Sequence, residues 1–294
     1  MKLFVFGSAG QLGHEILKRM DRTDLSAATA DIKEVDITRS DQVFAAVRRE
    51  CPDVIVNCAA FTDVDRAEAE SSRAYAVNCE GTGNLAVAAR EIGARFLHVS
   101  TDFVFDGHAS SPISELAATN PVSVYGASKL AGEKRALEIY PEKTLVVRTS
   151  SLHGRGGPNF VHTMIKLFSE KEQVRVVSDR RMTATWAGWL AEVLLELAAR
   201  REAGIVNAAC SGVLSWYEFA QEILALVKGQ IPNAARLRLE AVPGETFKLA
   251  APRPAYSALD CARLTALLGR PPITWQEGLR RHLSDLGYFS GGQQ

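Results

Sequence analysis

The sequence has no excess of charge of either sign. Its 34 lysines and arginines are matched by 34 aspartates and glutamates, which gives a formal net charge of zero at pH 7. Without net charge, no overall field draws the chain to nucleic acid or to an acidic membrane surface. We therefore expect neither as a partner, and an anionic ligand has to be held by a local group of side chains.

Cysteine is scarce and long apolar runs are missing. The five cysteines are odd in number and widely spaced, and no two of them form a C-x-x-C pair. This spacing predicts reduced, mostly buried thiols in a cytoplasmic protein and excludes a disulfide framework or a cysteine metal site. No run approaches the roughly eighteen apolar residues of a membrane helix, and the apolar run in "MKLFVFG" is too short for a signal peptide.

Short apolar runs alternate with helical patterns over residues 1–150. The runs in "KLFVF", "DVIVNCAA" and "TLVVRTS" have the length of strands, and amphipathic segments such as "QLGHEILKRM" and "SDQVFAAVRRE" lie between such runs. Near-continuous apolar runs of this length predict parallel strands that are buried on both faces. The alternation therefore predicts an α/β fold with a Rossmann-type doubly wound parallel sheet.

Beyond about residue 150 the alternation becomes irregular. Helical patterns and short strand-like runs are separated there by proline-rich loops such as "APRPAY" and "GRPPITW". We divide the chain into a Rossmann domain over residues 1–150 and a smaller C-terminal lobe that consists mainly of residues 151–294. A later segment, roughly residues 180–218, is expected to pack back on the sheet.

The first predicted strand leads directly into "GSAGQLG", in which Gly7, Gly10 and Gly13 are three residues apart. The backbone N–H groups of a glycine turn can approach a pyrophosphate closely, and the helix that follows presents its positive N-terminus to it. A tight strand–helix turn without a ligand is the alternative. The position after the first strand favours a dinucleotide site.

Other residues fit the remainder of a dinucleotide. Asp31 lies eighteen residues after Gly13, where an acidic side chain usually receives the hydroxyls of the adenosine ribose. Asp36 either caps a helix or contacts adenine, and Lys33 nearby leaves the choice between NADH and NADPH open. The small side chains of Ala59 and Ala60, which follow another strand, would let a cofactor lie close to the backbone.

A tyrosine and a lysine stand four residues apart in "VYGASKLAGE". This spacing puts Tyr125 and Lys129 on one face of a helix, where contact is expected with or without catalysis. Thr101 and Asp102 end the strand "RFLHVSTD" at the edge where ligands bind in open α/β folds, although such hydroxyls also cap turns. Beside a dinucleotide loop, the three groups predict a site for proton and hydride transfer, because a lysine ammonium stabilises a tyrosine phenolate.

Further motifs are distributed along nearly the whole chain, among them "DVIVNCAAFTDVDRAE", "HVSTDFVFDG", "NPVSVYGASKLAGE", "VVSDRRMTATWA" and "RPAYSALD". Together they resemble the extended short-chain dehydrogenases/reductases and, within them, the dTDP-4-dehydrorhamnose reductase family. The resemblance implies reduction of the C4 keto group of dTDP-4-dehydro-L-rhamnose to dTDP-L-rhamnose. The implied cofactor is NADPH or NADH, and the implied partner is a dTDP-linked keto sugar.

The resemblance also implies roles for individual residues. Tyr125 would be the general acid that protonates the C4 oxygen, while Lys129 would lower the pKa of Tyr125 and bind ribose. Thr101 would complete the catalytic set, and Asp102 beside it would touch the sugar. The cofactor pocket would be lined, together with Gly7 and Ala59, by Gly10, Gln11, Leu12, Asp31, Asp36, Ile37, Ala60, Phe61, Thr62 and Val99.

Three positions depart from the family pattern. Ser151 stands where a substrate-contacting tryptophan is expected, Phe103 replaces a frequent tyrosine, and Ala184 replaces a proline. Loss of the tryptophan ring removes a large apolar or stacking surface from the substrate wall. The catalytic set is thus intact while the wall is altered, which affects the choice of sugar more than the reaction. We therefore include Ser151 among the substrate-binding candidates.

Two alternatives follow. One is a reductase of another nucleotide-linked 4-keto-6-deoxy sugar, and the other is a non-catalytic NADP-binding regulatory subunit like methionine adenosyltransferase β. Some members of the family bind Mg²⁺ at acidic residues between subunits, and Glu15 matches one such position. A glutamate on a helix face explains Glu15 equally well, so no metal site is predicted. The resemblance is compatible with a homodimer.

Overall fold

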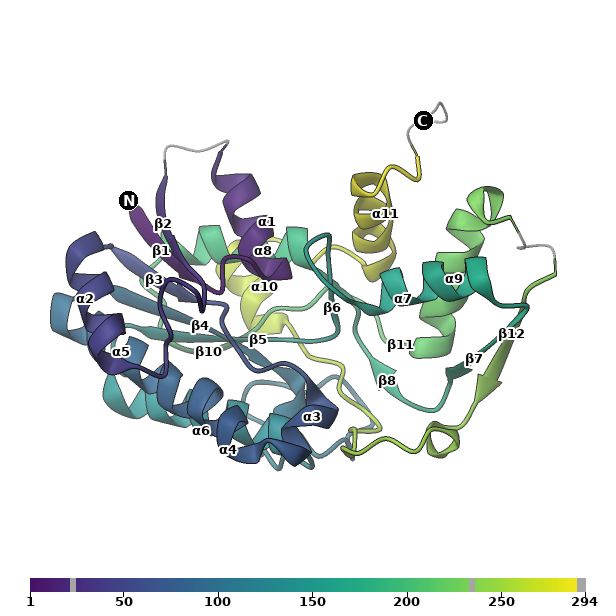
Figure 1. Ribbon diagram of the computed structural model, residues 1–294, viewed down its shortest axis with the longest axis horizontal. Helices are drawn as coiled ribbons and strands as arrows, with labels where there is room; N and C mark the ends of the chain where they lie inside the picture. Colours follow the sequence, from purple (N-terminus) through teal and green to yellow (C-terminus); the bar gives the residue numbers. More distant parts are fainter. Residues whose placement is uncertain (22–24, 233–235, 290–294) are drawn as a thin grey trace.

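Six parallel strands form one sheet at the centre of the larger part of the molecule (Figure 1). The computed structural model describes residues 1–21, 25–232 and 236–289. The strand order is β10-β5-β4-β3-β1-β2, which confirms the predicted doubly wound sheet. The strands are β1 (Lys2–Phe6), β2 (Ser26–Ala30), β3 (Val54–Asn57), β4 (Arg95–Thr101), β5 (Thr144–Thr149) and β10 (Gly204–Asn207).

Helices cover both faces of this sheet (Figure 1). On one face lie α1 (Gln11–Met20), α8 (Ala187–Ala198) and α10 (Ala262–Leu268). On the other face lie α2 (Ser40–Glu50), α5 (Thr82–Ile92) and α6 (Val124–Ile139).

The side chains of β1 show why a near-continuous apolar run forms such a strand. Leu3 and Val5 belong to the core cluster beneath α1 and α8, whereas Phe4 and Phe6 belong to the cluster beneath α2 and α5. All four are at most 1% exposed. Because successive side chains of a strand point to opposite faces, a strand buried on both faces needs apolar residues at every position.

Most of the remaining elements form the part of the molecule on the right in Figure 1, whereas the short helices over residues 64–81 pack beside α6 in the larger part. In the part on the right, the short strands pair as β6 with β9, β7 with β12, and β8 with β11. The elements are α3 (Val64–Ala69), α4 (Ser71–Tyr75), η1 (Ala76–Gly81), η2 (Asp102–Val104), β6 (Leu152–His153), α7 (Phe160–Glu170), β7 (Gln173–Val177), β8 (Arg181–Met182), β9 (Thr185–Trp186), β11 (Leu214–Ser215), α9 (Trp216–Val227), η3 (Lys228–Gln230), β12 (Arg238–Val242), η4 (Gly244–Thr246) and α11 (Trp275–Asp285).

The structure differs from the sequence prediction in two local respects. The segment "SSRAYAVNCEGTGNLAVAAREIG", residues 71–93, has one continuous helical pattern in the sequence, but the structure divides it into α4, the π-helical turn η1 and α5. The short helices α3 and α10 have six and seven residues, too few for a helical period to be recognised in the sequence. Over the residues that the structure describes, no helix has both the length and the apolar character of a membrane span.

Three imidazoles meet where β6, α7 and α11 pack together. His153 Nδ1 lies 2.9 Å from His282 Nδ1, and the ring of His162 lies 5.3 Å from that of His282. His153 and His282 are at most 1% exposed. Burial holds the pKa of His153 well below its usual value and lowers that of His282 to about 4, with neighbouring imidazoles acting in the same direction. Both rings are therefore neutral in the folded protein at pH 7.

This cluster predicts a loss of stability in mild acid. In the unfolded chain His282 binds a proton below pH of about 6.5, whereas in the folded protein it does so only below about 4, so stability falls between these values. The His282 contribution alone amounts to about 3 kcal/mol at the acid end of this window. Urea unfolding measures the free energy of unfolding at pH 7 and at pH 4.5. Its decrease between the two pH values should be smaller for His282→Leu than for the wild type. The exposed His108 gives the control His108→Gln, and an unchanged pH dependence in His282→Leu would contradict the prediction.

Candidate active site

The glycine loop brings three backbone segments close together at the end of β1. Gly7 has a φ of +75°, and a Cβ atom at this residue would lie 2.5 Å from the backbone nitrogen of Ala59. A Cβ atom at Gly13 would collide with the carbonyl oxygen of Gly7. Gly10 begins α1 without a side-chain cap, so the first N–H groups of the helix point outward unpaired by a capping side chain. These features fit the pyrophosphate of a dinucleotide.

The acidic residues after β2 support this loop in different ways. Asp31 accepts hydrogen bonds from the backbone N–H groups of Ala9, at 3.0 Å, and Ile32, at 2.8 Å. Its carboxylate thus lies against the glycine loop. Its contact with the adenosine ribose stays a prediction. Asp36 accepts from the N–H and hydroxyl groups of Thr38, both within 2.9 Å. Asp36 therefore stabilises a local turn before α2 and does not cap that helix, which begins after Arg39 without a side-chain cap. Contact of Asp36 with adenine stays a prediction.

The loop after β3 carries the next four predicted cofactor residues. Ala59 donates its N–H to Asn57 Oδ1 at 3.0 Å, and both backbone polar groups of Phe61 are bonded to the amide of Asn78. Ala60 is partly buried, and Thr62 is exposed. The predicted residue Ile37 is only 6% exposed and packs in the core, where Gly81 leaves room for its side chain. Gln11 and Leu12 form the first turn of α1.

Tyr125 lies in the first turn of α6. Ser123 caps this helix by accepting from the N–H of Gly126 at 3.2 Å, and Glu68 of α3 accepts from the N–H of Val124 at 2.8 Å. The Tyr125 hydroxyl forms a hydrogen bond with that of Thr101 at the end of β4. The structure therefore brings together the tyrosine and threonine that the sequence predicted.

The surroundings of Tyr125 keep its proton in place. Burial raises the pKa of Tyr125 to about 12, although the hydrogen bond with Thr101 opposes this shift. The sequence predicted the opposite direction, a pKa lowered by Lys129. The reason is that Lys129 Nζ is directed into the sheet, where it donates to the carbonyl oxygen of Val99 at 2.7 Å. Burial lowers the pKa of Lys129 itself to about 8.

Asp102 is 1% exposed, and hydroxyl groups surround its carboxyl group. Ser150 donates to Oδ2 at 2.8 Å and Thr101 donates to Oδ1 at 3.1 Å, while Ser257 forms a third hydrogen bond. Burial raises the pKa of Asp102, and the three hydroxyls act against this shift. The carboxyl group of Asp102 therefore holds the side chains of Thr101, Ser150 and Ser257 in place.

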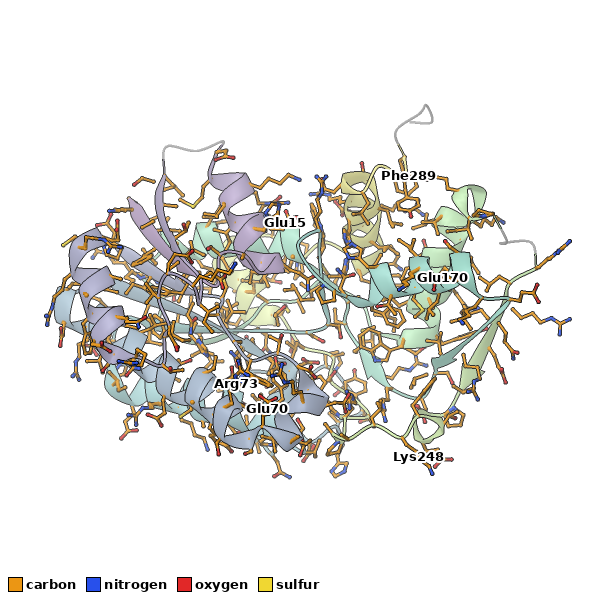
Figure 2. All side chains as sticks on the ribbon, viewed as in Figure 1. Glu15, Glu70, Arg73, Glu170, Lys248 and Phe289 are labelled. Carbon is orange, nitrogen blue, oxygen red and sulfur yellow. The ribbon has the colours of Figure 1, made fainter. Side chains whose placement is uncertain are left out.

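Glu15 on α1 (Figure 2) is fully buried, unlike a glutamate on a solvated helix face. Arg19 forms an ion pair with Glu15 and a second one, of 3.1 Å, with Glu192 of α8. The guanidinium also lies 5.0 Å from the centre of the Trp186 ring. Arginine thus supplies the positive charge for both carboxylates, and within the described ranges no three acidic, histidine or cysteine side chains are grouped to hold a metal ion.

A cavity of about 380 Å³ opens beside the Thr101–Tyr125 pair. Phe103, Ser151 and Ser257 are among its lining residues, and the rings of Phe103 and Tyr125 meet edge to face with 5.6 Å between their centroids. The cavity thus joins the predicted catalytic residues to the C-terminal part of the chain. The aromatic and cationic residues that line its remainder include Phe160, Trp216, Phe247, Arg175, Arg180, Arg181 and Arg253.

Four arginines line this cavity in a chain without net charge. Arg253 pairs with Asp65 at 2.6 Å and Arg181 pairs with Glu218 at 2.7 Å. Among the described residues, Arg180 has no ion pair, and burial together with the charge of Arg253 lowers its pKa. The composition predicted that an anion would need such a local group. The individual arginines were not predicted, although "VVSDRRMTATWA" and "RPAYSALD" contain three of them.

Ser151 lies on the cavity wall in an unusual backbone conformation. Its φ is +43°, which few residues other than glycine adopt readily. Its carbonyl oxygen accepts from the N–H of Thr185 at 3.2 Å, which holds the segment in place. Ser151 and Phe103 line the same cavity.

Comparison with known proteins agrees with this arrangement. The family model described as the RmlD substrate binding domain matches residues 1–287. A dTDP-4-dehydrorhamnose reductase of Streptomyces griseus is 40% identical, over 94% of this chain and 90% of the relative. The chain belongs to the dTDP-4-dehydrorhamnose reductase family.

Solved structures of this family have the same fold. A dTDP-4-dehydrorhamnose reductase of Clostridium acetobutylicum superposes with a TM-score of 0.92 at 37% identity, covering 98% of this chain and all of the other. One of Bacillus anthracis, in complex with NADP, gives a TM-score of 0.91 at 34% identity, covering 97% and 99%. The glycine loop and the Thr101–Tyr125 pair therefore lie in a fold that holds NADP in another member of the family.

Proposed function

We propose that the protein reduces the C4 keto group of dTDP-4-dehydro-L-rhamnose to give dTDP-L-rhamnose, with NADPH or NADH as the reductant. The observation that carries this proposal is the hydrogen-bonded Thr101–Tyr125 pair, whose tyrosine ring packs on Phe103 in the wall of an arginine-lined cavity. Membership of the dTDP-4-dehydrorhamnose reductase family supports the same substrate.

Residues of the protein itself supply the proton for the reduction. The reduced nicotinamide supplies the hydride that reaches the C4 carbon. Tyr125 Oη gives its proton to the C4 oxygen, and Thr101, which donates its own proton to Asp102, positions the tyrosine hydroxyl. A phenol whose pKa is about 12 releases its proton only as negative charge develops on the substrate oxygen. Asp102 keeps the Thr101 hydroxyl in place, and Lys129 lies beneath the site.

Cofactor binding and substrate binding belong to different parts of the sequence. We assign cofactor binding to residues 1–150, through Gly7, Gly10, Gln11 and the loops after β2 and β3, and substrate binding mainly to residues 151–294. The segment 180–218 contributes the strand β10 to the sheet and the helix α8 to one of its faces. The proposal includes a cytoplasmic protein that forms a homodimer, on the support of its unpaired cysteines and its family.

The arginines of the cavity suit the diphosphate of the nucleotide, and the rings of Phe160 and Trp216, 4.6 Å apart, suit its thymine. Arg180→Met should weaken the binding of dTDP at least about tenfold, because a charge-assisted hydrogen bond to phosphate is lost from a partly buried site. Calorimetric titration with dTDP measures this. The exposed Arg238 gives the control Arg238→Met, and equal dTDP affinities of the two variants would contradict the assignment.

The test of the substrate is turnover. Purified protein is mixed with NADPH and dTDP-4-dehydro-L-rhamnose, and the fall in cofactor absorbance is followed together with the sugar product. A second 4-keto-6-deoxy sugar linked to dTDP is assayed in parallel, since Ser151 in the cavity wall favours a different sugar as the second candidate. Bound cofactor without turnover of either sugar would overturn the reductase assignment, and preference for the second sugar would replace the substrate.

Ser151→Trp tests the altered wall directly. A ring at this position adds stacking surface over the ligand, so the KM for the dTDP sugar should fall by about threefold to tenfold. Because the residue has a positive φ, Ser151→Gly serves as the control for backbone strain. A KM that changes equally in both variants, or in neither, would refute this account of the wall.

A further inference from the structure

Behind Lys129 lies a buried chain of polar side chains that the reaction scheme above does not use. Asn57 and His98 face each other on the paired strands β3 and β4, with Asn57 Nδ2 3.1 Å from His98 Nδ1. On the far side of the ring, His98 Nε2 lies 3.5 Å from Lys129 Nζ. Asn57 and His98 are fully buried, and Lys129 is 2% exposed.

The backbone fixes the direction of the amide of Asn57. The N–H of Ala59, which can only donate, lies 3.0 Å from Asn57 Oδ1. Asn57 therefore turns its NH₂ group toward His98. The second neighbour of that group agrees, because Thr82 donates its own hydroxyl proton to the carbonyl oxygen of Asn78 at 2.8 Å and keeps a lone pair for Asn57 Nδ2 at 3.4 Å.

The amide of Asn57 in turn fixes the tautomer of His98. Since Asn57 Nδ2 donates to His98 Nδ1, that ring nitrogen carries no proton, and the proton of the neutral ring is on Nε2. The Nε2–H group then points at Lys129 Nζ. A donor at this position opposes an ammonium group, whereas a neutral amine accepts from it and still donates one N–H to the carbonyl oxygen of Val99.

We propose that Asn57 and His98 are positioning residues that set the proton affinity of Lys129. Asn57 holds His98 as the Nε2–H tautomer, and His98 presents a hydrogen-bond donor to Lys129 Nζ, which favours release of the lysine proton. The proposal rests on the proposed function and takes the Lys129 ammonium as the group that would bind the ribose of the nicotinamide beneath Tyr125. It adds two residues to that site, neither of which touches the substrate.

The other groups around Lys129 act on it from two sides. Glu133, one turn further along α6, raises the pKa of Lys129, and so does the Cys58 side chain. Glu133 is also held by Arg148, which shares its charge. Burial lowers the pKa of Lys129. The hydrogen-bond donor of His98 thus favours the neutral form of Lys129, as burial does, whereas the Glu133 carboxylate favours the charged form.

The tautomer of His98 is the first measurement. Long-range ¹H–¹⁵N correlation spectra of the full chain distinguish the two tautomers and the imidazolium, and the signal that His98→Gln removes gives the assignment. We expect the Nε2–H tautomer throughout pH 6 to 8. The Nδ1–H tautomer or an imidazolium in the wild type would overturn the proposal. Because this spectrum needs no turnover, it stands even where the substrate assignment fails.

The second measurement uses a variant that reverses the direction of the hydrogen bonds between residue 57, His98 and Lys129. The carboxylate of Asn57→Asp accepts from both Ala59 and His98 Nδ1, so His98 should become the Nδ1–H tautomer and turn a lone pair toward Lys129. The alkaline limb of the kcat/KM profile should then move up by about one pH unit, a tenfold change in proton affinity. A changed tautomer with an unmoved limb would overturn the proposal. If Asn57→Asp does not fold, the wild-type tautomer alone decides.

Two controls separate this effect from its alternatives. Thr82→Val removes the other acceptor of the Asn57 amide, and it should leave both the tautomer and the alkaline limb where they are. Asn57→Asp combined with His98→Leu adds the same charge without the imidazole, and its limb should match that of His98→Leu alone. A shift of the full size in either control would contradict a role for His98 in setting the proton affinity of Lys129.

Discussion

Tyr125→Phe is expected to lower kcat for reduction of the keto sugar by at least about a hundredfold, the scale of general acid catalysis. The ring keeps its contact with Phe103 at 5.6 Å, so the cavity wall is unchanged and only the proton donor is lost. The hydroxyl of Thr101 cannot take over, because it donates to Asp102 at 3.1 Å. Steady-state kinetics with saturating cofactor should therefore show a loss in kcat with little change in KM.

Tyr140 provides a matched control for this variant. It ends the same helix, α6, is 3% exposed and packs in the core beneath the far end of that helix. Tyr140→Phe removes the same hydroxyl group at a distance from the site, so kcat should stay within about twofold of the wild type. If Tyr125→Phe retained near wild-type turnover, Tyr125 would not be the acid.

Arg148→Met is expected to cost about 3 to 5 kcal/mol of the free energy of unfolding, since it leaves a buried carboxylate without its partner. Arg148 of β5 and Glu133 of α6 form an ion pair of 2.6 Å, with side chains only 3% and 1% exposed. Two more hydrogen bonds, of 2.9 and 3.2 Å, join the guanidinium to the same carboxylate. Urea denaturation at pH 7 measures the loss.

Removal of both charges distinguishes a buried pair from a simple loss of packing. A chain with Arg148→Met and Glu133→Leu together should recover much of the stability lost by Arg148→Met, because no uncompensated charge then remains in the core. The position is suited to this test because α6 and β5 are well packed around the pair. A single-variant loss below about 1 kcal/mol, or a double variant less stable than Arg148→Met, would contradict this account.

The sheet could be predicted from the sequence because its strands are buried on both faces. The runs that became β1 and β3 are apolar at nearly every position, and the helices between them, α1 and α2, begin and end where the pattern placed them. The later short strands could not be predicted in this way. Strands such as β8 and β9 have two residues each, and only contacts with distant segments define them.

The residues of the site divide in the same way. Tyr125 and Lys129 share one helix and Gly7 follows a strand, so local spacing was enough to find them. The arginines of the cavity come from segments as distant as Arg175 and Arg253, and only the folded chain brings them together. The direction of the Tyr125 pKa shift was wrong for a similar reason, since the contact between Lys129 and Val99 depends on how deeply α6 packs against β4.

The central claim is the reduction of a nucleotide-linked keto sugar at C4, and an isotope experiment tests it most directly. Purified protein is incubated with dTDP-4-dehydro-L-rhamnose and NADPH that carries deuterium at the transferable position of the nicotinamide, and the product is examined by mass spectrometry and NMR. The account predicts dTDP-L-rhamnose with one deuterium, at C4 of the sugar. Recovery of the unreduced keto sugar from protein that binds NADPH, or deuterium at any other carbon, would contradict it.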